Sequence, residues 1–252
     1  MNISLKINGI EHEIEAPPST TLLSAIRGLG LHGVKFGDEG GLSGADTILL
    51  NGKPVNAGSM LAAQAEGHNI ATIESLGEHP EQGWKTTEGL HPLQKAFVEN
   101  GSIQCGYCTP AQILAAKSLL EENSNPTESQ VREAISGVLC RCTGYIKPVQ
   151  AILKAAAEMR GDIDIRDSGF PIPDSGFSSS DSFSPPSLTS NLLTKPKVIL
   201  TPESKTWQTV GKPEIKVDAI KLVQGKPAFT ADFEKTWHVT CKSFTIRHMH
   251  ML

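Results

Sequence analysis

The sequence predicts an α+β chain in which a small sheet-forming unit is followed by a helical unit. Apolar and polar residues alternate in residues 3–15, and Asn8-Gly9 between the two runs is typical of a two-residue hairpin turn. Residues 92–159 instead show helical apolar spacing with capping signals. Four of the five cysteines lie within this helical stretch at short spacings. The sequence therefore suggests that the helical unit carries a site built from sulfur.

The first unit, residues 1–76, is expected to run strand–hairpin–helix–loop–hairpin–strand. Ser19-Thr20 offers a cap for a helix that contains Leu22 and Ile26. A loop punctuated by glycines follows, and Asn51-Gly52 marks a second hairpin. A short helix at 60–64 and a last strand at 70–73 complete the unit. This order is consistent with a β-grasp arrangement.

The second unit, residues 77–159, is expected to contain four helices. They are predicted to begin at Pro92, Thr109, Thr127 and Pro148, because each position carries a capping or helix-opening residue. Four helices joined by short loops run up-down-up-down, which places the first and third connections at the same end. Those two connections carry the cysteines: Cys105, Cys108, Cys140 and Cys142. We therefore expect the two cysteine pairs to meet in space.

The remaining chain changes in composition. Residues 160–195 are rich in Ser, Pro and Gly and repeat an Asp-Ser-Gly-Phe motif, which predicts a flexible linker. Residues 196–252 regain apolar content, but the stretch is too short and interrupted to bury much core alone, so it is expected to be the start of a larger unit. The fifth cysteine, Cys241, is interpreted as an ordinary free thiol. The terminal His248 and His250 are expected to be solvated.

Composition excludes several classes of function. The net charge of −4 leaves no basic field for nucleic acid or an anionic membrane surface. No run of eighteen apolar residues is present, and the first residues lack the pattern of a signal peptide. A cytoplasmic location is therefore expected. In that compartment, cysteines at short spacings favour metal binding or catalysis over disulfides.

Two metal sites fit the cysteine quartet. A [2Fe–2S] cluster requires four thiolates, two for each iron, and a structural zinc ion accepts the same four ligands. Spacing alone does not distinguish them. For a cluster, the negative charge would be offset by Arg141, which lies between two of the cysteines, and by helix N-terminal N–H groups, for which we expect those of Ala111 and Gln112.

The motifs QCGYCTP (104–110) and LCRCTGY (139–145) closely resemble the second iron–sulfur domain of the molybdenum hydroxylases, the xanthine dehydrogenase and aldehyde oxidase family. Residues 1–159 as a whole are similar to the family's iron–sulfur unit, including LHGVKFG and HPLQKAFVENG. The resemblance implies a β-grasp ferredoxin-like domain followed by a four-helix [2Fe–2S]-binding domain. It also implies that the cysteine quartet holds the cluster nearest the molybdenum cofactor. Gln104 would then hydrogen-bond the pterin, and Cys142 would lie against it.

The implied function is electron transfer within a molybdenum hydroxylase, an oxidoreductase. Electrons would pass from the molybdopterin centre through one [2Fe–2S] cluster to an electron acceptor. The implied partner is the molybdenum-cofactor-binding portion, on another chain or in a continuation of this one. The sequence contains no catalytic centre of its own, and it leaves the substrate, purine or aldehyde, open.

The chain departs from the family pattern in its first unit. A plant-type cluster uses C-x4-C-x2-C and a distant fourth cysteine. The corresponding positions, after the G-x-K-x-G stretch at 33–37, hold Asp38, Ser43 and Asp46, and the fourth falls near Gly58. Oxygen ligands are poor substitutes for thiolates on iron–sulfur cores. We therefore predict a scaffold without a cluster; a hard-cation site that uses Asp38, Glu39 and Asp46 is the alternative.

A second resemblance lies near the end of the sequence. VDAIKLVQGKPAFTADFE (217–234) looks like the opening of the family's molybdenum-binding portion. The alternative to an electron-transfer portion is a non-catalytic structural module or a truncated remnant, with zinc or nothing at the cysteines. Colour separates these hypotheses, because a [2Fe–2S] protein is red-brown and a zinc protein is colourless.

Overall fold

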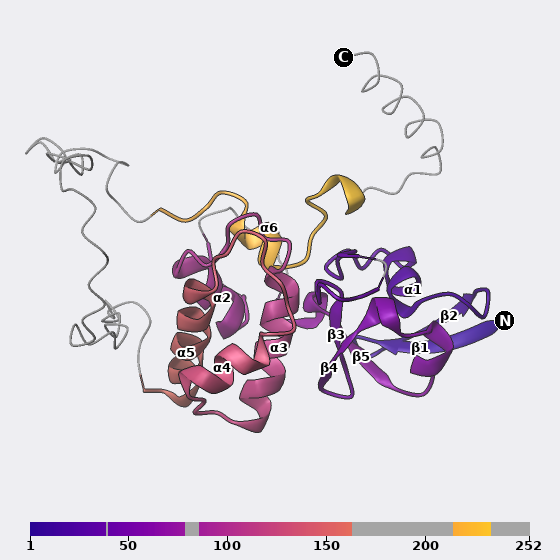
Figure 1. Ribbon diagram of the computed structural model, residues 1–252, viewed down its shortest axis with the longest axis horizontal. Coiled ribbons are helices and arrows are strands. Elements are labelled where there is room, and N and C mark those ends of the chain that lie inside the picture. Colours follow the sequence, from indigo (N-terminus) through magenta and orange to yellow (C-terminus); the bar gives the residue numbers. More distant parts are fainter. Residues whose placement is uncertain (39, 79–85, 163–213, 233–252) are drawn as a thin grey trace, which may run out of the picture. The chain divides into compact units, whose positions relative to one another are not determined.

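The computed structural model describes residues 1–38, 40–78, 86–162 and 214–232 (Figure 1). The described residues 1–38, 40–78, 86–162 and 215–232 belong to one compact unit. Residues 163–195 of the predicted linker and the residues Cys241, His248 and His250 lie outside the described residues, whereas Arg160, the first linker residue, is the last residue of α5. The described part is mixed α/β, with a small sheet and a set of helices, as the sequence predicts at this level.

The sheet has five strands. They are β1 (Asn2–Ile7), β2 (Ile10–Glu15), β3 (Thr47–Leu50), β4 (Lys53–Asn56) and β5 (Asn69–Ala71), in the spatial order β2-β1-β5-β3-β4. β1 pairs parallel with β5, and the other neighbours are antiparallel. Both hairpins turn at Asn-Gly, where all four central residues have positive φ, as a type I′ turn requires. The two Asn-Gly predictions are confirmed.

The helix α1 (Leu22–Gly28) shares an apolar core with the sheet, and its N-cap is Thr21 rather than the predicted Ser19-Thr20. Alternate residues of β1 are fully buried against it, so the period-two pattern at the start of the sequence marks a core-facing strand. The short helix predicted at 60–64 is instead a pair of 3-10 turns, Ala57–Ser59 and Ala62–Ala65. A further 3-10 turn, Ile73–Ser75, follows β5.

Four helices follow, one at each predicted place: α2 (Pro92–Glu99), α3 (Thr109–Glu122), α4 (Glu128–Ala134) and α5 (Ile146–Arg160). Thr127 and Gln130 form the predicted capping box of α4. The N-cap of α3 is Cys108 rather than Thr109, so a cysteine directly precedes the first residue of the helix. α5 begins before Pro148, which is tolerated because the N–H groups of the first helical turn have no intrahelical partner.

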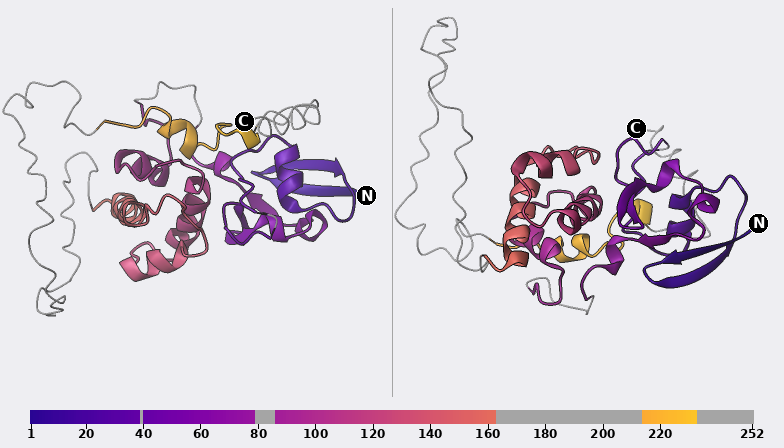
Figure 2. Two further views of the ribbon diagram at one scale, coloured as in Figure 1. Left: turned by 45° about the horizontal axis from the view of Figure 1, so that its top comes forward. Right: turned by 90° about the horizontal axis from the view of Figure 1, so that it is seen from below.

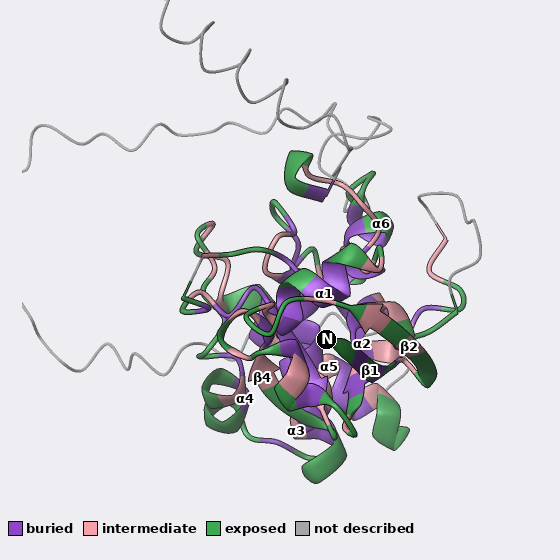
Figure 3. Ribbon diagram, turned by 90° about the vertical axis from the view of Figure 1, so that its right-hand side faces the viewer, coloured by how far each residue is buried: buried purple, intermediate pink, exposed green. Residues whose placement is uncertain are grey.

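A last described segment, residues 214–232, contains α6 (Ala219–Val223) and a 3-10 turn, Thr230–Asp232. α6 contacts α2 and α3 and contributes its buried residues to the same apolar core as those helices (Figure 2). Buried residues gather on the inner sides of the helices, with exposed residues outward (Figure 3). This core thus combines residues from three stretches of sequence, 49–76, 90–156 and 219–223.

Candidate metal centre

The four cysteines line one small cavity between the α2–α3 and α4–α5 connections. Its lining also includes Gln104, Gln112, Gly144 and Pro148. The expectation that helix topology brings the two pairs together is therefore met. Cys105 is exposed and the other three are half-buried, so the site lies close to the protein surface.

The thiols are arranged as two facing pairs, each with one cysteine from each connection. The Cys105 side chain interacts chiefly with Cys142 and the Cys108 side chain chiefly with Cys140, and Cys140 also interacts with Cys142. Burial raises the pKa of Cys105 and of Cys108, and the facing cysteine adds to the rise in each case. The pKa of Cys142 is lowered, first because the backbone N–H of Cys105 donates to its sulfur. The environment of Cys142 therefore favours the thiolate form that metal binding requires.

This arrangement fits a two-iron cluster better than a single ion. Zinc requires its four ligands around one centre, whereas a [2Fe–2S] cluster takes two thiolates on each of two irons. Two facing pairs of thiols match the second requirement.

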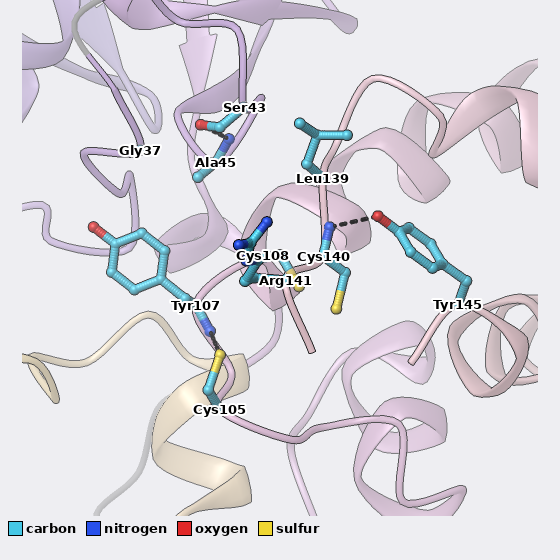
Figure 4. Close-up of a pocket in the computed structure, with 10 residues that line it drawn as sticks. All are labelled: Gly37, Ser43, Ala45, Cys105, Tyr107, Cys108, Leu139, Cys140, Arg141 and Tyr145. Atoms are coloured by element: carbon cyan, nitrogen blue, oxygen red, sulfur yellow. Dashed lines mark hydrogen bonds between the residues drawn. The ribbon is translucent and has the colours of Figure 1, made fainter. Parts of the chain in front are cut away.

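Local backbone geometry fixes the two cysteine-bearing turns, which we call the first corner (Cys105–Cys108) and the second corner (Cys140–Tyr145). Gly106 has φ +86°, and the next N–H, that of Tyr107, donates to Cys105 Sγ at 3.5 Å. In the second corner the N–H of Cys140 donates to the Tyr145 hydroxyl at 2.8 Å (Figure 4). Thr143 adopts a left-handed conformation with φ +57°, which is uncommon for a residue with a branched side chain.

Gln112 is a site residue whose side chain the sequence did not single out. It is 1% exposed, it lines the cysteine cavity, and its Nε2 has no hydrogen-bond partner among the described residues. The expectation for its backbone was wrong, because that N–H donates to the Cys108 carbonyl at 3.0 Å within the helix. An orphaned buried amide is costly unless something accepts from it. A cluster sulfur would be such an acceptor, so the residues present fit the group.

We expect Gln112→Met to lower the reduction potential of the cluster by up to about 60 mV, which is a tenfold change in the equilibrium constant of a one-electron couple. The reason is that a hydrogen bond to sulfur favours the more negative, reduced state. A redox titration followed by electron paramagnetic resonance measures this. Gln150→Met, at a half-buried position on α5 outside the cavity lining, is the matched control. Equal potentials in both variants would contradict a role for the amide.

Two further cavities adjoin the cysteines. One, of about 220 Å³, is lined by Gln104 and by the second corner and its helix, including Thr143, Gly144 and Lys147. The other, of about 390 Å³, is lined by three of the cysteines together with Tyr107, Leu139 and Arg141 (Figure 4). Arg141 is exposed, so its charge lies beside the cysteines at the solvent boundary.

The four positions that the family resemblance assigns to a first cluster, Asp38, Ser43, Asp46 and Gly58, are linked in pairs by carboxylates. Asp38 accepts from the N–H groups of Gly40, Leu42 and Ser43 at 2.8, 3.0 and 2.7 Å. These bonds, chiefly those from Leu42 and Ser43, lower the pKa of Asp38 to about 2. Asp46 is 1% exposed and accepts from Gly58 N–H at 2.5 Å.

The two carboxylates differ in electrostatic state. Burial raises the pKa of Asp46, and its Oδ1 has no hydrogen-bond partner within the described structure. Asp38 instead has both oxygens occupied by backbone donors. Neither carboxylate presents a free pair of oxygens to a cation. The third residue of the hard-cation alternative, Glu39, lies outside the described residues, and the geometry of the two described carboxylates gives that alternative no support.

Comparison with known proteins identifies the family. A family model described as a [2Fe-2S] binding domain matches residues 72–153. The nicotinate dehydrogenase small FeS subunit of Eubacterium barkeri is 42% identical over 159 residues, which are 63% of this chain and 96% of that protein. The nicotine 6-hydroxylase small subunit of Paenarthrobacter nicotinovorans is 39% identical over 160 residues, 63% of this chain and 92% of that protein.

A solved structure agrees with these relatives. The aldehyde oxidoreductase from Desulfovibrio desulfuricans superposes with a TM-score of 0.69 at 30% identity, over 92% of this chain and 22% of that chain. This chain thus corresponds to about a fifth of that much longer protein.

The fold and the two facing pairs of thiols define an iron–sulfur electron-transfer protein. The chain belongs to the [2Fe–2S]-binding small subunits of the molybdenum hydroxylases. Its function is to transfer electrons through a [2Fe–2S] cluster as part of an oxidoreductase. None of the helices in the described parts of the chain has the length and apolar character needed to cross a bilayer.

Proposed function

We propose that Cys105, Cys108, Cys140 and Cys142 are the ligands of one [2Fe–2S] cluster. The observation that carries this proposal is the convergence of all four on a single cavity as two facing pairs. The orphaned amide of Gln112 supports it, because a cluster would supply the acceptor that the protein lacks. The N–H groups of both corners hold sulfur and backbone in fixed positions, so little reorganisation is needed when charge changes.

We further propose that Gln104 and Cys142 face the pterin of a molybdenum cofactor. When bound, that cofactor would supply the hydroxylation chemistry, with water as the oxygen source, and would pass on the two electrons removed from the substrate. The cavity of about 220 Å³ beside Gln104, Thr143 and Lys147 offers hydrogen-bonding groups at the protein surface where such contact would occur. The partner is accordingly the molybdenum-cofactor-binding portion, on another chain or in a continuation of this one. Several relatives are named as small subunits, which supports a partner of this kind.

The first part of the chain is proposed to be a β-grasp scaffold that carries no cluster. In this interpretation Asp38 and Asp46 satisfy the loop N–H groups that would otherwise surround a cluster. With one cluster, electrons would leave it directly for an external acceptor. The proposed organisation remains 1–76 as scaffold, 77–159 as cluster domain, 160–195 as linker and 196–252 as the start of a molybdenum-binding domain, in a cytoplasmic protein.

Reduction of the purified chain tests this function. The protein, purified without oxygen, should be red-brown and should bleach when it accepts one electron for each cluster. The reduced form should give the paramagnetic resonance spectrum of a single type of cluster. A colourless protein that contains zinc would contradict the proposal and favour a structural module.

A further inference from the structure

The segment 214–232 lies against the first cysteine corner. We propose that this segment, fastened by Asp232, positions the Cys105–Cys108 corner and reduces the access of water to its Tyr107–Cys108 side, and in this way sets the reduction potential of the cluster. The inference rests on the proposed function, since it concerns the cluster held by that corner. Its contacts fall into three groups: apolar packing of α6, an aromatic contact at the corner, and a buried ion-pair cluster.

The apolar packing brings α6 onto the backbone of the corner. Leu222 is 3% exposed and belongs to the core shared with α2 and α3. A Cβ built on Gly106 would lie 2.6 Å from Leu222 Cδ1, so the glycine backbone is in direct contact with this side chain. Gln94 on α2 secures the helix by donating from Nε2 to the Val223 carbonyl at 2.8 Å. Leu222 thereby limits the conformations open to the residue that follows Cys105.

The aromatic contact covers the next residue of the corner. The Phe229 ring lies edge-on to the Tyr107 ring, with centroids 5.0 Å apart and an interplanar angle of 73°. The Lys35 ammonium lies 5.0 Å from the centre of the same Phe229 ring. The Tyr107 hydroxyl donates to the Phe36 carbonyl at 2.5 Å. Both residues between Cys105 and Cys108 are therefore held from outside the corner, one by Leu222 and one by Phe229.

The ion-pair cluster fastens the segment to the α/β part of the chain. The Asp232 side chain is fully buried and receives hydrogen bonds from Lys35 Nζ at 2.7 Å and Arg27 Nη1 at 3.4 Å. Arg27 also donates to the Ala231 carbonyl at 2.5 Å. Lys35 and Arg27 are 2% and 6% exposed, so two cations are buried beneath this one segment. Removal of one partner from such a group leaves buried charge uncompensated and strongly favours opening.

The extent of the relatives agrees with a separate role for this segment. The match to the nicotinate dehydrogenase small subunit covers 159 residues, which is too few to reach from β1 to α6, yet it accounts for 96% of that protein. The aldehyde oxidoreductase match extends over 92% of this chain. This chain is thus longer than that small subunit, and its own segment 214–232 supplies the contacts to the corner.

The test compares reduction potentials in the full chain. Phe229→Ala should keep the iron of the parent chain but raise the potential by about 60 mV or more, equal to at least a tenfold change in a one-electron equilibrium constant. The sign follows because water stabilises the more highly charged reduced cluster. Asp232→Asn should shift the potential in the same direction, since it frees the segment. Both variants should bleach faster in air than the parent chain.

Controls separate positioning from folding. Thr230→Ala, an exposed uncharged neighbour of Phe229, should leave the potential unchanged, and Phe229→Tyr should restore most of the parent value. If Phe229→Ala loses iron, the reduction potential of Phe229→Leu is measured instead, and the inference predicts that it is higher than that of the parent chain. Variants that keep their iron and share the parent potential and resonance spectrum would overturn the inference. A parent chain without iron would overturn the proposed function instead, so the two failures are distinct.

Discussion

Cys140→Ser is expected to abolish the cluster and to destabilise the helical part of the protein. Cys140 comes from the second corner and faces Cys108 of the first, so its loss leaves three thiolates for a group that requires four. Iron content should fall from about two per chain towards zero, and the red-brown absorbance should disappear.

The loss of stability follows because binding of the cluster is part of the folding free energy. A bound group present at about 1,000 times its dissociation constant contributes ~4 kcal/mol. A loss of that size lowers the melting temperature of a chain of this length by roughly 8–16 °C. Cys241→Ser is the matched control, since Cys241 is not one of the four and should leave iron and melting unchanged. Parent-like absorbance and melting in Cys140→Ser would refute the assignment of ligands.

The second large effect is expected on iron content when cysteines are placed at the four positions that the resemblance assigns to a first cluster. The combined variant Asp38→Cys, Ser43→Cys, Asp46→Cys and Gly58→Cys should raise iron from about two to about four per chain. The positions still lie together: Asp38 bonds the N–H of Ser43, and Asp46 bonds the N–H of Gly58. A Cβ on Gly58 would lie 2.8 Å from Asp46 Oδ2, so Gly58→Cys requires that Asp46 be replaced at the same time.

The control for this experiment is the triple variant that keeps Gly58. With three thiolates it should retain the parent iron content. A second type of cluster in the quadruple variant alone, seen as a new resonance signal, would show that the loop still has the shape of a cluster site. An iron content that stays at about two per chain in the quadruple variant would mean that the loop of this chain no longer has a geometry suited to a cluster.

Local patterns in the sequence predicted much of the fold. Both Asn-Gly turns, the capping box at Thr127 and the places of the four helices depend on residues within a few positions of one another. The convergence of the cysteines was also predictable, because it follows from helix order and short loops. The N-cap of α3 and the start of α5 were not, since neither Cys108 nor Tyr145 is a favoured N-cap residue.

Contacts between distant residues were not predictable from such patterns. Asp232 and Arg27 are 205 positions apart, and nothing near either residue indicates the other. Gln112 carried a weak signal, as a polar residue one turn after Cys108 on a helix whose neighbouring positions are apolar. The role of Asp38 could have been suspected, because Asp side chains often bond N–H groups a few residues ahead.

Iron and acid-labile sulfide per chain, measured on protein purified without oxygen, test the central claim most directly. One cluster held by the two facing pairs of cysteines predicts about two irons and two sulfides, with no zinc. About four irons would contradict the scaffold account of the first unit, and zinc without sulfide would contradict the cluster itself.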